Sequence, residues 1–239
     1  DHKPIYQAST SKIPLLPIYI VEPEYWKQPF ASRRHWHFIH DCLIELRQDL
    51  KQLGQGLIVR KGSVVDIFKE FSDHYFIKNI YAHEETGNQW TYNRDIKVQK
   101  WCKKNNIILN EFPTNGVVRG LKNRSEWSKI RKTRIHDALI KTPQRLTALI
   151  GMEEGAIPEK NDPIFKNNFN GKVQKGGRIE ALSILESFLN DRGKGYLFNI
   201  SAPGKSEITS SRISVHLTWG TISSKEVQNV INIKKENLL

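Results

Sequence analysis

Cysteine is scarce in this chain, and its scarcity excludes two classes of structure. Among the 239 residues only Cys42 and Cys102 are cysteines, and both fall in segments of helical periodicity. Two such residues supply neither a disulfide framework nor a four-cysteine metal site. We therefore expect a reducing, cytoplasmic compartment.

Long apolar runs and the common nucleotide and metal motifs are missing as well. No run approaches the roughly 18 apolar residues of a membrane span, and no signal peptide is visible, so we expect no membrane partner. The Gly54-Gln55-Gly56 triplet precedes a predicted strand, which leaves a dinucleotide fingerprint unsupported, and there is no Walker A motif. The His83-Glu84-Glu85-Thr86-Gly87 run does not complete a zinc-binding H-E-x-x-H motif, because Gly87 occupies its last position.

Positive charge is in clear excess. The chain has 37 Lys and Arg against 25 Asp and Glu, a formal net charge of +12. This favours a polyanionic partner, nucleic acid first and an anionic membrane surface second; drift in an AT-rich genome remains the alternative. The segment from Arg119 to Arg134 holds seven basic residues, one acid and Trp127. It suits phosphate contacts, although we favour a solvated helix with its tryptophan in the core.

Short apolar runs and amphipathic helices alternate through the first half of the chain. The helix opened by Ser32 has an apolar stripe from Trp36 to Leu53, and Gly54 ends it. Ser63 and Asp66 have the spacing of a capping box. The predicted strands cover residues 15–21, 57–59, 77–82 and 107–112, and further helices cover 63–71 and 88–104. This alternation indicates a parallel sheet covered on both faces.

After Pro113 the pattern changes, which suggests three parts. Residues 1–117 form an α/β domain, residues 118–176 a linker with a basic helical segment, and residues 177–239 the beginning of an all-helical domain. Prolines, glycines and asparagines in 141–177 are typical of a linker. Gly177 opens a helix with an apolar face, and two more helices are predicted at about 211–218 and 223–235.

The run from Ser210 to Ser223 carries the most specific chemistry. Two hydroxyls, Arg212 and a third hydroxyl precede an apolar-periodic segment. Free backbone N–H groups, the helix dipole, serine hydroxyls and a guanidinium together make a site for a phosphate or sulfate. An ordinary serine N-cap is the alternative reading of this spacing.

The same run resembles the S/T-S-R-L-S-P-x-L-x-x-G-x-L-S signature of the DNA photolyase/cryptochrome family, with Ile213 in place of Leu and Val215 in place of Pro. The resemblance implies that FAD is bound by its diphosphate. It also implies which residues contact the flavin, namely Tyr196, Ser210, Ser211, Arg212, Ile213 and Ser214. The N-terminal part resembles the family's antenna domain through Ile18-Tyr19-Ile20-Val21-Glu22-Pro23-Glu24, Ser32-Arg33-Arg34-His35-Trp36, His83-Glu84-Glu85-Thr86-Gly87-Asn88 and Asn115-Gly116-Val117-Val118-Arg119.

The resemblance sets the fold and function that we expect. The fold is an α/β, Rossmann-like parallel-sheet antenna domain that lacks its first strand, followed by the start of an all-α FAD-binding domain. We therefore read the sequence as a fragment, inactive alone, of a monomeric lyase that repairs pyrimidine dimers in DNA with light. No catalytic side chain is expected, because the flavin supplies the chemistry. Two alternatives stay open: a cryptochrome that signals blue light without repair, and an electron-transfer-flavoprotein-like protein that binds its ligand within residues 13–112.

An antenna chromophore (a folate, a deazaflavin or a second flavin) is also implied. Folate-binding members carry an Asn-Glu pair before an Arg-Asp pair; here Arg94-Asp95 is present, but Trp90-Thr91 stands in place of the first pair. A metal site is not expected. His35, His37 and His40 are interpreted as a solvated helix face, and His216 as a core residue.

Overall fold

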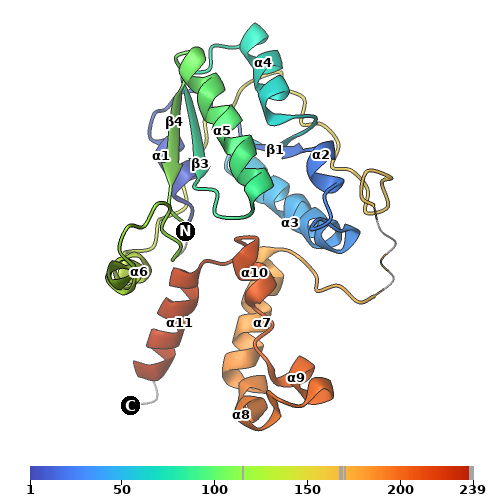
Figure 1. Cartoon of the computed structure of the whole chain (residues 1–239), viewed down its shortest axis with the longest axis vertical. Coiled ribbons are helices and arrows are strands. Elements are labelled where there is room, and N and C mark those ends of the chain that lie inside the picture. Colours follow the sequence, from blue (N-terminus) through green and yellow to red (C-terminus); the bar gives the residue numbers. More distant parts are fainter. Residues whose placement is uncertain (115, 167–168, 170, 237–239) are drawn as a thin grey trace.

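The four apolar runs of the first half form parallel strands that pair two by two. The structure, a computed structural model, describes residues 1–114, 116–166, 169 and 171–236 (Figure 1). Strand β1 (Ile18–Val21) pairs with β2 (Ile58–Lys61), and β3 (Asn79–His83) pairs with β4 (Ile108–Phe112). Both pairs are parallel, with Ile18 opposite Ile58 and Asn79 opposite Ile108. The predicted parallel strands are thus confirmed, although each is a few residues shorter than or shifted from its sequence range.

One helix of this half precedes β1, and the others lie between the strands in sequence. They are α1 (Lys3–Ser9), α2 (Pro23–Trp26), α3 (Arg33–Gln52), α4 (Val64–His74) and α5 (Gln89–Lys104). The predicted ends hold for α3, where Gly54 follows the C-cap with φ +107°, and for α4, where the Ser63 hydroxyl accepts the Asp66 N–H. Ser32 makes no side-chain cap bond. Helix α1 was not predicted, and it packs against β3 and β4.

The sheet is split along its middle. Within the described residues no strand lies between β1 and β3, and the two sheets are separate. Residues Ile18–Ile20 of β1 and Ile77–His83 in and before β3 line one cavity of about 2070 Å³. The cavity therefore separates the two parallel pairs of strands.

Part of the predicted linker packs into the core of the α/β region. Phe165 stacks on Trp36 of α3, with ring centroids 4.1 Å apart and an angle of 14° between the planes. Leu146 is buried in the same cluster, beside Leu43 and Leu57. The segment is therefore bound to the α/β region by its own apolar side chains.

The second half is helical. Its elements are η1 (Arg124–Glu126), α6 (Trp127–His136), α7 (Arg178–Asn190), η2 (Arg192–Gly195), α8 (Tyr196–Asn199), α9 (Pro203–Thr209), α10 (Ser214–Thr218) and α11 (Ser224–Glu236). Figure 1 shows α7 to α11 below the α/β region, with α6 to one side. Trp127 was expected in the core, which is wrong: its side chain is 41% exposed and its indole N–H donates to Gly116. Asn115, in the motif before it, lies outside the described residues.

The start of α10 differs from its predicted position. Helix α10 begins at Ser214 rather than near residue 211, because Arg212 adopts a left-handed φ of +58° that a helix does not allow. Among the described residues, no helix combines the length and the apolar character needed to cross a membrane.

Candidate functional site

The turn from Ser210 to Ser214 joins α9 to α10. Arg212 occupies the left-handed region, which is uncommon for a residue with a side chain and accompanies functional sites. Its carbonyl oxygen accepts a hydrogen bond from the Gln174 side chain at 2.8 Å. Ser210, Ser211 and Arg212 are half-buried and Ser214 is exposed. The turn is therefore held by its backbone, with its polar side chains within reach of solvent.

Hydrogen-bond donors collect at this turn without acceptors. Within the described residues, the backbone N–H groups of Ser211, Arg212, Ile213 and Ser214 have no acceptor. The hydroxyls of Ser210, Ser211 and Ser214 and the Arg212 guanidinium likewise donate to no described group. Four adjacent amides, three hydroxyls and one cation form a set of donors that a phosphate group satisfies.

Ile213 determines both how α10 begins and how the turn is anchored. Ile213 is the N-cap of α10 and no side chain caps the helix, so an ordinary serine N-cap does not describe the segment. The Ile213 side chain is 9% exposed and packs with Ala181, Leu185 and Ile222. Its side chain therefore anchors the turn in this apolar cluster.

Tyr196 is linked to the turn through other side chains. It opens α8, is half-buried, and meets the Phe188 ring edge-on with centroids 6.0 Å apart. The Arg192 guanidinium lies 5.9 Å from the centre of the same Phe188 ring and bonds to the turn itself. Tyr196 thus connects to Ser210–Ser214 through Phe188 and Arg192. Sequence reasoning missed Arg192, because its partners are mainly backbone carbonyls, which leave no residue pattern.

A compact ionic cluster occupies the carboxyl ends of β1 and β3. Arg94 contacts Glu22 (3.1 Å), Glu85 (3.2 Å) and its neighbour Asp95 (2.9 Å). Burial raises the pKa of both Glu22 and Asp95, and Arg94 opposes that effect. Trp90 packs edge-on against Tyr25 beside the cluster. The charged side chains of the cluster lie at the sheet edge where open parallel sheets bind ligands, and they line the cavity of about 2070 Å³.

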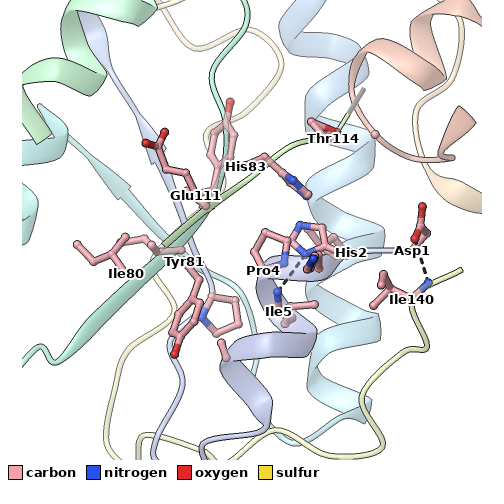
Figure 2. A pocket seen from close by; sticks show the side chains of 18 of the residues that line it. Asp1, His2, Pro4, Ile5, Ile80, Tyr81, His83, Glu111, Thr114 and Ile140 are labelled. Atoms are coloured by element: carbon pink, nitrogen blue, oxygen red, sulfur yellow. Dashed lines mark hydrogen bonds between the residues drawn. The ribbon is translucent and has the colours of Figure 1, made fainter. Parts of the chain in front are cut away.

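The cavity between the sheets opens beside two histidines. Figure 2 shows the rings of His2 and His83 next to each other, and their centroids are 4.7 Å apart. The Asp1 carboxylate accepts the Ile140 N–H at 3.0 Å and pairs with Lys225 at 2.8 Å. Burial lowers the pKa of His83. The cavity includes residues 217–226 in its lining but not the turn at 210–214.

The remaining histidines differ from one another in environment. The interpretation of His37 and His40 as a solvated face is wrong, since His37 Nε2 and His40 Nδ1 are buried and make no hydrogen bond in the described part of the chain. His40 Nδ1 lies 3.6 Å from the Asp41 carboxylate. That part contains no group of three side chains able to hold a metal. The core prediction for His216 is confirmed: the ring is fully buried, 5.0 Å from Phe38.

The comparison with protein families decides the identity of this fold. A family model described as DNA photolyase matches residues 1–126, more than half of the chain. The chain belongs to the DNA photolyase family. The matched range covers the paired strands, the Arg94 cluster and the start of the basic segment. The resemblance inferred from the motifs is therefore confirmed.

Members of the family resemble the chain along nearly its whole length. The blue-light photoreceptor PHR2 of Arabidopsis thaliana is 24% identical, over 95% of this chain and 57% of its own. A Synechocystis cryptochrome matches in structure with a TM-score of 0.78 at 19% identity, over 98% of this chain and 53% of its own. A class III photolyase from Agrobacterium tumefaciens gives 0.76 at 18%, over 95% and 49%. The chain thus spans about half the length of these relatives, and the two structures show the fold alone.

Proposed function

We propose that this chain contributes the antenna domain and the first part of the flavin site to a light-driven enzyme that repairs pyrimidine dimers in DNA. The observation that carries the proposal is the set of donors at Ser210–Ser214 that have no acceptor among the described residues, at the place where the sequence resembles the family signature. Residues 1–117 are the antenna domain, residues 118–176 connect it, and residues 177–239 begin the FAD-binding domain. The net charge of +12 supports DNA as the partner.

The residues at the turn fit a diphosphate. The N–H groups of residues 211–214 and the three serine hydroxyls bind its oxygens, and the Arg212 guanidinium neutralises part of its charge. Tyr196 packs edge-on against Phe188, and Arg192 lies over the same ring and bonds to the turn. When bound, FAD supplies the light-driven electron chemistry of such enzymes. The chain's own residues hold and orient it.

The antenna pigment is a separate question. Trp90, in the place of the folate-type residues, packs on Tyr25, and the Arg94 ion pairs occupy the adjoining sheet edge. We therefore leave a folate out of this proposal. A deazaflavin or a second flavin stays compatible with it.

A cryptochrome that signals without repair is the second candidate. It is favoured by the similarity to a blue-light photoreceptor and to a cryptochrome. Repair distinguishes the two. A chain of the relatives' length that carries these residues is illuminated with DNA containing pyrimidine dimers, and loss of dimers is measured against a dark control. Light-dependent loss supports the repair enzyme, and no loss from a flavin-loaded protein supports signalling.

A further inference from the structure

Arg192 lies directly behind the turn that carries the proposed flavin contacts. It belongs to η2, between α7 and α8, and all five N–H groups of its side chain have an acceptor. Nε donates to the Ser187 hydroxyl (2.7 Å), Nη1 to the carbonyls of Ile208 (3.1 Å) and Ser210 (2.6 Å), and Nη2 to those of Ile184 (3.0 Å) and Ser211 (3.4 Å). One side chain thus ties the end of α7 to the segment that returns from α9.

These bonds fix which way the amides of the turn face. In a planar trans peptide the carbonyl and the next N–H point to opposite sides. Because the carbonyls of Ser210 and Ser211 point at Arg192, the N–H groups of Ser211 and Arg212 point away from it. They are two of the four adjacent N–H groups without an acceptor in the described residues. Arg192 therefore directs donors outward by holding the carbonyls behind them.

The charge of Arg192 also affects the turn. No carboxylate among the described residues pairs with it, and its neighbour Asp191 contacts Lys194 at 3.7 Å instead. Carbonyl dipoles and the Phe188 ring, 5.9 Å away, are its surroundings. A half-buried cation without a counter-ion raises the positive potential at the turn, which favours an anionic ligand there.

We propose that Arg192 is a positioning residue that pre-forms the phosphate-binding turn. It holds the carbonyls of Ser210 and Ser211 so that the amides of Ser211 and Arg212 face an incoming diphosphate. The inference rests on the proposed flavin site, which supplies the ligand. The role of Arg192 in holding the turn is tested without any ligand. A negative result for that role and a negative result for the flavin site can therefore be told apart.

The first experiment measures how firmly the turn is held. Trypsin cleaves after Arg212, and the rate is followed by mass spectrometry against cleavage after exposed Lys205 of the same chain. Arg192→Gln accelerates cleavage at Arg212 by about tenfold, the change that loss of one charge-assisted hydrogen bond produces. Arg192→Lys, with three donors and no planar fork, gives an intermediate rate. Lys194→Gln removes the same charge two residues away from an exposed side chain and leaves the rate unchanged.

The second experiment separates positioning from general damage. In a chain of the relatives' length that carries these residues, dissociation constants are measured for FAD and for riboflavin, which has the same ring system and no diphosphate. Arg192→Gln weakens FAD by about tenfold and leaves riboflavin unchanged. Equal weakening of both ligands, or a cleavage rate at Arg212 that stays constant in Arg192→Gln or rises as much in Lys194→Gln, would overturn the proposal. If the unaltered protein of the relatives' length binds no FAD, the flavin site fails while the trypsin result still decides the role of Arg192. Arg192→Lys serves both measurements if Arg192→Gln does not fold.

Discussion

The Glu45 carboxylate, on α3, accepts the backbone N–H groups of Arg178 (2.9 Å) and Ile179 (3.0 Å) in the first turn of α7. A side chain of the α/β region therefore closes the N-terminus of a helix in the second half. The N-cap residue is Gly177, with a φ of +105°, and a Cβ there would meet Glu45 Oε2 at 2.2 Å. Glycine is needed at this position both for its backbone angle and for the close approach of the carboxylate.

Removing the Glu45 carboxylate weakens the contact between α3 and the N-terminus of α7. Glu45→Ala leaves two N–H groups without their acceptor and lowers the free energy of unfolding by about 1–2 kcal/mol. Glu45→Gln keeps an acceptor oxygen and has a smaller effect. Urea denaturation followed by circular dichroism measures both. Glu70→Ala, on an exposed part of α4, is the control, and an equal loss there would contradict the capping role.

Phe165 holds the connecting segment on the α/β core. Its ring is fully buried against Trp36, so Phe165→Ala removes a large buried side chain and costs about 3–5 kcal/mol. Phe76→Ala is the matched control, because that ring is 93% exposed, and its effect stays within about 0.5 kcal/mol. Urea midpoints of the two variants test the difference. Similar midpoints would mean that residues 141–177 behave as a free linker.

Acid destabilises the packing of α10 on α3 through His216. Burial lowers the pKa of His216 below its ordinary 6.5, and its Nε2 is buried without a partner in the described residues. As the pH falls below about 6.5 the unfolded chain binds a proton that the folded chain does not, so the free energy of unfolding decreases. His216→Phe keeps a ring against Phe38 and removes this proton. The pH dependence of unfolding becomes flatter in that variant, and an unchanged slope between pH 7 and 5 would contradict the assignment.

The cavity between β1 and β3 predicts loose packing in this chain. Within the described residues β1 and β3 each pair on one edge only, and the cavity of about 2070 Å³ between them exposes apolar side chains of both strands. We expect strong binding of a hydrophobic dye and a broad thermal transition. A sharp, cooperative melt without dye binding would contradict this expectation.

Local patterns in the sequence predicted much of the α/β region. Ser63 and Asn88 marked the starts of α4 and α5, since caps act within one turn of chain. Helix α1 was missed although Pro4 lies in its first turn, because its N-cap is His2, which is not a usual capping residue. The burial of Phe165 on Trp36 depends on a contact between distant segments that no periodicity shows.

At the Ser210–Ser214 turn, too, the sequence predicted some features and not others. The signature around Arg212 pointed to a phosphate site, and the structure places donors without acceptors there. The left-handed Arg212 was not predictable, because a positive φ at a residue other than glycine has no sequence mark. That angle shortened α10 and explains why the predicted helix start was wrong. The role of Arg192 was not predictable either, because four of its five acceptors are backbone carbonyls, which leave no residue pattern in the sequence.

Retention of FAD by an Arg212→Ala variant tests the central claim most directly. The unaltered protein and the variant, each in a chain of the relatives' length, are purified and their flavin absorbance is compared per mole of protein, with Lys205→Ala on exposed α9 as the control for charge. We predict that Arg212→Ala loses most of its flavin, because the guanidinium neutralises part of the diphosphate charge, while Lys205→Ala keeps it. Equal flavin absorbance in all three proteins would contradict the assignment of the Ser210–Ser214 turn as the site that binds the diphosphate.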